Sequence, residues 1–369
     1  MKVSYHVFKD YRMTTSAQTD EEKLSQVSEK EAAKARENLY SFVSMSYDRK
    51  RKILFLGCTH RNGDILVEFD PKSGKFNSCG FGKTDIYHGP QDVKIHKGLT
   101  LDPDGEALYF GIATLSPLPE LIGKPGGAIV RYDIEKRKFT SLGRPMNGDY
   151  IQGTCFDFQR GLAYLFTDRG NFGVFDMNKK KLLQYESMQS TPHNGCIDSE
   201  GGVWGTFSPA TQSFYRYNPS SEKFEFPGST LPNSRAAANV MYPGAGPVDS
   251  FVNGGDGYLY VGSPLGDLYR LDPRDGALKF LGRPFDDRRL PGLAIGPDGW
   301  LYLSGGNTRA SMLSRYNREE NRFEYLGSVE HPDGTYLHYA HEIVVVDNVV
   351  YIGETDNPSR SGYLWKCEL

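Results

Sequence analysis

Apolar and polar positions alternate along most of the chain in short runs that Gly, Pro, Asp and Asn interrupt. One template recurs: an apolar strand, a tight turn such as DPDG, an aromatic-rich strand ending in Gly, a loop, and a strand of the form RYD followed by F/L and LG. The clearest copies are 98–111 with 129–143, 250–262 with 267–282, and 292–305 with 313–327. Alternation with period two is typical of half-buried β-strands. The chain is therefore predicted to be a series of β-units.

Seven copies can be aligned on the aromatic residue of the second strand. The anchors are Phe55, Tyr109, Tyr164, Trp204, Tyr260, Tyr302 and Tyr351. Seven four-stranded antiparallel sheets arranged radially make an all-β, seven-bladed β-propeller, expected here as a single domain over 1–369. The last copy ends after three strands, and the alternation in VSYHVF (3–8) predicts the outer strand that closes the ring. The Ala/Glu/Lys-rich stretch 20–39 predicts one helix, with Asp20 as its N-cap.

Composition narrows the classes of partner. A net charge of −3 argues against non-specific binding to nucleic acid or to an anionic membrane, because both need a basic excess. No run of 18 apolar residues is present, so no membrane span is expected. The N-terminus lacks an apolar stretch of signal-peptide length, and the five cysteines form no CxxC motif. These features predict a cytoplasmic protein with reduced thiols.

Candidate chemistry gathers on one predicted face. The long loops 114–127, 227–248 and 328–341 share that face, and long loops on a rigid scaffold carry function. Seven of the eight histidines fall in or beside this set, with His60 expected to be exposed. His96, His193 and His341 stand immediately before first strands, which line the central channel of a propeller, so they are expected to converge at its mouth. Gln152 and Asp249 occupy similar positions in other blades, and Tyr150 and His338 lie in the same set of loops.

Converging imidazoles suit two kinds of chemistry. One is general acid–base catalysis near neutral pH, and the other is binding of a divalent metal such as Ca, Mn or Zn. No cofactor is certain from the sequence. Arginines on the same face predict an anionic ligand, because the guanidinium group grips carboxylates bidentately. They are Arg61, Arg144, Arg169, Arg235, Arg283, Arg288, Arg289, Arg309 and Arg360. The motifs GxSxG and HExxH, the P-loop and the dinucleotide-binding fingerprint are absent from the sequence.

The segments KIHKGLTLDPDGEALYFG (94–111), PGGAIVRYD (125–133) and 341–369 resemble a group of seven-bladed propellers that act on acidic polysaccharides. These are the rhamnose–glucuronate lyases and their rhamnosidase-like relatives, with ulvan and oligogalacturonate lyases as more distant relatives. The resemblance implies that His96 is catalytic or contacts substrate. Lys97 follows it, where the resemblance implies a small hydroxyl residue.

The favoured interpretation is an enzyme that cleaves a uronate-containing oligosaccharide by β-elimination. His96 and His193 are the candidate acid/base pair, with Tyr150 as an auxiliary acid or base. Candidate substrate-binding residues are His341, Arg235, Gln152 and His338. Three alternatives stay open: a rhamnosidase-like glycoside hydrolase on the same scaffold, a lactonase-type metal-dependent propeller, and a propeller that binds a sugar or a protein without catalysis.

Overall fold

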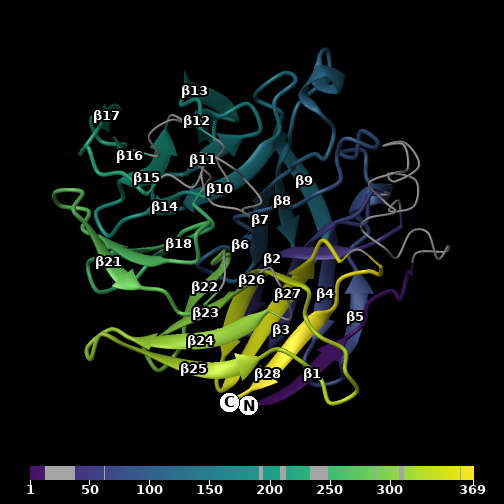
Figure 1. Ribbon diagram of the computed structural model, residues 1–369. Coiled ribbons are helices and arrows are strands. Elements are labelled where there is room, and N and C mark those ends of the chain that lie inside the picture. The colour runs from purple at the N-terminus through teal and green to yellow at the C-terminus, as the bar shows by residue number, and fades with distance from the viewer. Residues whose placement is uncertain are drawn as a thin grey trace.

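The computed structural model describes residues 1–12, 38–61, 63–190, 194–207, 213–232, 248–286, 289–306, 311–357 and 359–369. Within them, seven four-stranded antiparallel sheets follow one another around a central axis (Figure 1). The first strand of each blade lies innermost and contacts the first strand of neighbouring blades, as β2 does with β26 and β6. The all-β, seven-bladed propeller predicted from the repeat is therefore confirmed.

The first four blades follow the order of the chain. Blade 1 contains β2 (Ser41–Asp48), β3 (Ile53–Thr59), β4 (Leu66–Asp70) and β5 (Lys75–Ser78). Blade 2 contains β6 (Thr100–Leu101), β7 (Ala107–Gly111), β8 (Ile129–Asp133) and β9 (Lys138–Gly143). Blade 3 contains β10 (Ile151–Asp157), β11 (Leu162–Thr167), β12 (Asn171–Asp176) and β13 (Lys181–Ser187). Blade 4 contains β14 (Cys196–Ile197), β15 (Val203–Phe207), β16 (Ser213–Asn218) and β17 (Lys223–Glu225).

The last three blades complete the ring. Blade 5 contains β18 (Ser250–Asn253), β19 (Leu259–Gly262), β20 (Leu268–Leu271) and β21 (Leu278–Gly282). Blade 6 contains β22 (Gly292–Ile295), β23 (Leu301–Gly305), β24 (Met312–Asn317) and β25 (Arg322–Ser328). Blade 7 contains β26 (Tyr339–Val346), β27 (Val349–Thr355), β28 (Leu364–Glu368) and β1 (Lys2–His6). Two short 3-10 turns, Phe81–Lys83 and Leu118–Leu121, lie in loops.

The N-terminal strand closes the ring, as the alternation over 3–8 predicts. β1 pairs antiparallel with β28, from Lys2 opposite Glu368 to His6 opposite Leu364, and the two termini lie side by side (Figure 1). This pairing covers the outer edge of β28, which would otherwise be open to other chains. The helix expected over 20–39 falls outside the described residues except for its last two positions.

Aspartates of the repeat explain its turns. Asp102, at the end of the first strand of blade 2, accepts a hydrogen bond from the Glu106 amide at 2.7 Å. Asp133, at the end of the RYD strand, accepts one from the Lys136 amide at 2.9 Å. A side-chain carboxylate that binds the backbone two to four residues ahead folds the chain into a tight turn. These aspartates are therefore the local reason that the two hairpins of blade 2 reverse where they do.

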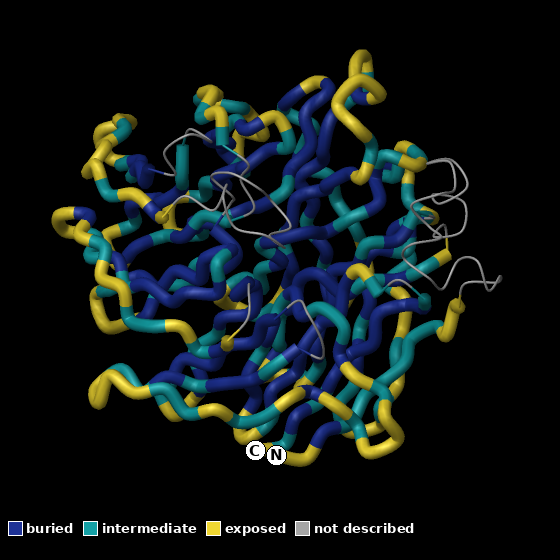
Figure 2. The backbone as a smooth tube through the Cα atoms, in the orientation of Figure 1, coloured by how far each residue is buried: buried dark blue, intermediate teal, exposed yellow. Residues whose placement is uncertain are grey.

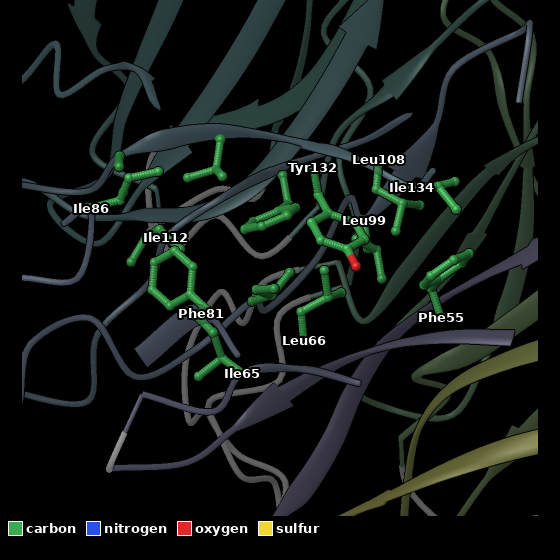
Figure 3. Close-up of a cluster of buried hydrophobic side chains, with 14 residues drawn as sticks. Phe55, Ile65, Leu66, Phe81, Ile86, Leu99, Leu108, Ile112, Tyr132 and Ile134 are labelled. Carbon is green, nitrogen blue, oxygen red and sulfur yellow. The ribbon is translucent and has the colours of Figure 1, made fainter. Parts of the chain in front are cut away.

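The apolar face of each sheet packs on the next sheet. Seven buried clusters lie between neighbouring blades, one for each of the seven pairs. Between blades 1 and 2, for example, Phe55 and Leu66 meet Leu108, Ile112 and Tyr132 (Figure 3). Each wholly buried side chain of this size contributes about 1.5–3 kcal/mol. Buried residues occupy the inner strands and exposed ones the peripheral turns (Figure 2).

Candidate functional site

Two of the bulges in first strands release candidate residues from the strand pairing. The ladder between β10 and β11 shifts register between Ile151 and Gly153, and the ladder between β26 and β27 shifts between Ala340 and Glu342. A bulge leaves one residue out of the pairing and re-aims its side chain. The residues released in this way are Gln152 and His341, both of which the sequence analysis assigned to substrate binding. His341 lies within β26, however, and not before it as expected.

His96 comes from the segment that leads into blade 2. Lys94 forms bridges with Thr59 and Ala113, which pin this segment between blades 1 and 2. The first strand of the blade begins four residues after His96, at Thr100, so His96 does not immediately precede it as predicted. Gly98 has φ +89, and a Cβ there would overlap the carbonyl oxygen of Thr154. Only glycine therefore allows the segment this close approach to blade 3.

His96 and His341 meet at the channel. Their Nε2 atoms lie 2.9 Å apart, and the two rings are tilted with centroids 4.8 Å apart. The side chains are 3% and 8% exposed. Because a neutral imidazole carries one N–H and one bare nitrogen, one Nε2 donates in this contact and the other accepts. The two imidazoles, which come from blades 2 and 7, therefore share a single proton between their Nε2 atoms.

Lys97 braces this contact. Its Nζ donates to the carbonyl oxygen of His341 at 2.9 Å and forms an ion pair with Glu342 at 2.8 Å. The amide of Lys97 also donates to the carbonyl of Gln152 at 3.2 Å. The residue that departs from the resemblance thus links blades 2, 3 and 7 around the histidine pair.

A second polar group lies beside the channel, formed by Gln152, Asp168 and Lys94. The amide of Gln152 donates to Asp168, while Asp168 Oδ2 and Gln152 Oε1 are buried with no hydrogen-bond partner among the described residues. Burial raises the pKa of Asp168 to about 7, an effect that the Gln152 hydrogen bond and the charge of Lys94 oppose. Burial lowers the pKa of Lys94 to about 8, although Asp356 and Asp168 act against it. Both groups can change protonation close to neutral pH.

Lys94 and Asp168 are functional candidates that the repeat pattern of the sequence alone does not indicate. Lys94 precedes His96 by two residues, and in an extended chain such residues point to the same side, so the KIH motif already held a signal for it. Asp168 follows β11, in the loop between the second and third strands of blade 3, on the face that carries the other candidates. Its distinguishing property is burial, which no local pattern in the sequence indicates.

Two of the remaining candidates, Tyr150 and His338, are described by the structure. Tyr150 is 0% exposed, and burial raises its pKa to about 12, so the phenol stays protonated near neutral pH; its role as an auxiliary acid or base stays a prediction. His338 packs against the ring of Tyr339 at 4.0 Å, and its amide donates to Glu354 at 3.0 Å. His193 and Arg235 lie outside the described residues, and the roles assigned to them stay predictions.

A cavity of about 430 Å³ opens next to the channel between blades 7, 1 and 2. We call it the side pocket. Its lining comprises Leu39, Tyr40, Ser41, Thr59, His60, Arg61, Leu115, Tyr339, Asp356, Asn357 and Arg360. His60 is 5% exposed, contrary to the expectation from sequence, because its ring stacks on Tyr40 with centroids 3.8 Å apart. Burial lowers the pKa of His60 to about 4, so the imidazole is neutral at physiological pH.

The described residues do not fit the divalent metal considered from the sequence. Nowhere in the described part of the chain do three His, Cys, Asp or Glu side chains gather closely enough to hold an ion. The Nε2 atoms of His96 and His341 face each other at hydrogen-bond distance, so these two nitrogens are not arranged around a shared metal.

Comparisons with known proteins identify the fold but no family. No family model matches the chain, and no curated protein matches it. Among solved structures, the chain is similar to the extracellular domain of BT4673 from B. thetaiotaomicron, titled a "putative hybrid two component system". The TM-score is 0.59 and the sequence identity 13%, and the match covers 89% of this chain and 38% of that one. The corresponding domain of BT3049 from the same organism gives 0.58 and 13%, over 89% of this chain and 40% of that one.

The chain thus spans less than half the length of these structural neighbours. Identity at this level supports the propeller fold alone, so the polysaccharide lyase group implied by the sequence resemblance has no support from the comparisons. Among the helices that the structure describes, none is long and apolar enough to span a bilayer.

Proposed function

We propose that this propeller is a carbohydrate-active enzyme that cleaves a uronate-containing oligosaccharide by β-elimination at the channel mouth. The observation that carries the proposal is the contact between His96 and His341, two imidazoles from separate blades with Nε2 atoms 2.9 Å apart. Such a pair holds one proton in a fixed place and can take up or release another, which is the requirement for general acid–base catalysis near neutral pH.

The reaction balances with these groups. A neutral imidazole of the pair accepts the proton from C5 of the uronate, and the C5–H electrons become the C4–C5 double bond. The C4–O bond breaks, and the leaving oxygen receives a proton from the same pair. Lys94 supplies a cation whose amine has no hydrogen bond or ion pair among the described residues, and it neutralises the substrate carboxylate as the enolate develops. Arg235, a candidate substrate-binding residue from the sequence, lies outside the described residues.

One observation favours a second candidate, a propeller that binds an acidic sugar without cleaving it. His96 and His341 are only 3% and 8% exposed, so a substrate atom reaches them only where the channel mouth admits it. Histidines at this depth can also fill the channel and fix the surrounding loops, which is a structural role.

The test is incubation with a panel of uronate-containing oligosaccharides while the ultraviolet absorbance of the C4–C5 alkene is followed. We expect His96→Gln and His341→Gln to lower kcat by about 10²–10⁴-fold. His88→Gln is the matched control, because His88 is an exposed histidine on the same face. New reducing ends without the alkene would indicate the hydrolase, and binding without any product would indicate the second candidate.

A further inference from the structure

The arginines of the long-loop face separate into two kinds. Five of the six that are described are already engaged by the protein. Arg144 pairs with Asp92 at 2.5 Å, Arg283 with Asp267 at 2.8 Å, Arg289 with Asp249 at 3.1 Å and Arg360 with Glu354 at 2.8 Å, while Arg169 donates to the Gly148 carbonyl at 2.9 Å. Guanidinium groups held in this way position loops and are not available to grip a ligand.

Arg61 is different. Its guanidinium group forms no hydrogen bond and no ion pair with any residue that the structure describes. It lies at the end of β3 and lines the side pocket. An arginine without a carboxylate partner inside a cavity of about 430 Å³, a volume typical of small-molecule sites, is a binding group for an anion.

Two other groups in the side pocket can bind a ligand. His60 Nδ1 is buried and has no hydrogen-bond partner among the described residues. The Asp356 carboxylate, which also lines the side pocket, is exposed and forms no hydrogen bond with described residues. A neutral imidazole and a carboxylate both bind hydroxyl groups, and the ring of Tyr40, stacked on His60, stiffens the wall. The side pocket thus offers one cation that can bind a carboxylate and polar groups that can bind hydroxyls. A sugar that carries a carboxylate has both kinds of group.

We propose that the side pocket is a subsite for a sugar that carries its own carboxylate, gripped by Arg61. The inference rests on the proposed function for the identity of the channel site, and it adds that the sugar next to the cleaved uronate is also acidic. His60 and Asp356 hold the hydroxyl groups of that sugar.

The side pocket lies near the channel site. Tyr339, in its lining, begins β26 two residues before His341. Asp356 lies close enough to Lys94 to raise the pKa of its amine. A sugar in the side pocket therefore places the adjoining sugar toward the histidine pair, as consecutive subsites of a saccharide site require.

The test is calorimetric binding of disaccharides of galacturonate, glucuronate and mannuronate, each compared with the same disaccharide after both carboxyls are reduced to primary alcohols. We expect at least one acidic disaccharide to bind more tightly than its reduced form. Arg61→Gln should weaken binding of that acidic disaccharide by about tenfold or more and leave the reduced form unchanged. Arg61→Lys, which keeps the charge and loses the planar fork, should fall between the two. Lys124→Gln, a loss of charge elsewhere on this face, should change neither.

The binding and turnover measurements can refute the side-pocket proposal and the elimination proposal independently of each other. If Arg61→Gln weakens both forms equally or neither, or if no acidic disaccharide binds, the side-pocket proposal is overturned even when alkene forms. If acidic disaccharides bind through Arg61 and no alkene forms with any substrate, the side pocket stands and the elimination reaction is refuted.

Discussion

The substitution Asp168→Asn tests whether the channel site is built at the expense of stability. Asparagine has nearly the same shape and keeps an oxygen for the hydrogen bond from Gln152, but it cannot ionise. Burial raises the pKa of Asp168 from its ordinary value of 3.8 to about 7, so the ionised form is disfavoured in the folded state. At 1.36 kcal/mol for each pKa unit, the ionised carboxylate costs about 4 kcal/mol above pH 7.

The raised pKa of Asp168 determines whether stability rises or falls with pH. Below pH 3.8 both the folded and the unfolded chain hold the proton, and there is no cost. Between 3.8 and about 7 the folded chain keeps a proton that the unfolded chain has lost, so the stability of the wild type falls as pH rises. The Asn variant lacks this dependence. Its stability relative to wild type should therefore grow by about 2.3 kcal/mol between pH 5 and pH 7 and level off above pH 7.

The assay is urea unfolding followed by tryptophan fluorescence at a series of pH values from about 5 to 8, with the slope m used to confirm that the unfolded states are comparable. Asp104→Asn, on an exposed turn, removes a charge without removing a buried one and serves as the control. A constant difference between Asp168→Asn and wild type across this range, or a variant less stable than wild type at pH 8, would show that the carboxylate is not held in a desolvated site.

Two further predictions follow from the same channel. Because the pKa of Lys94 is about 8, its rate of acylation by a small amine-reactive reagent should level off just above pH 8, whereas ordinary lysines continue to gain reactivity up to about pH 10. The rates are measured by peptide mass spectrometry, and a Lys94 rate that rises with pH as the other lysines do would contradict its burial. Gly98→Ala should lower the free energy of unfolding by more than Gly105→Ala does. Both glycines have positive φ, which costs an alanine about 1–3 kcal/mol, but only at Gly98 would the new Cβ overlap a neighbour. Equal losses of stability in thermal or urea unfolding would mean that the backbone of blade 3 shifts to make room for the Cβ.

The fold was accessible from sequence because its determinants are local and repeated. The Asp or Asn at the end of the third strand binds amides of its own turn in several copies, and alternation fixes which face of each strand is buried. Ring closure followed from counting strands, since a blade with three strands leaves an edge that only another segment can cover.

The site was accessible only in part. The topology itself brings His96 and His341 to the channel, which is why their positions near first strands were informative. The bulges that release Gln152 and His341, the burial of Tyr150 and Asp168, and the partners that engage five arginines all arise between blades, where the sequence carries no local pattern. Arg61 is distinguished from Arg360 only by the absence, among described residues, of a carboxylate beside it.

The distribution of stability over the molecule explains how such a site can persist. Seven interblade clusters provide apolar burial all around the ring, and no single one depends on the channel residues. The stability that these clusters provide offsets two destabilising groups in the channel. They are a desolvated carboxyl and a lysine of lowered pKa, each of which destabilises the folded state near neutral pH. Structural ion pairs elsewhere on the same face, such as Arg144 with Asp92, satisfy their buried charges. The buried polar atoms without a partner at the channel, Gln152 Oε1 and Asp168 Oδ2, lie beside two groups of shifted pKa, and this combination is better explained by a ligand that completes them than by the needs of folding.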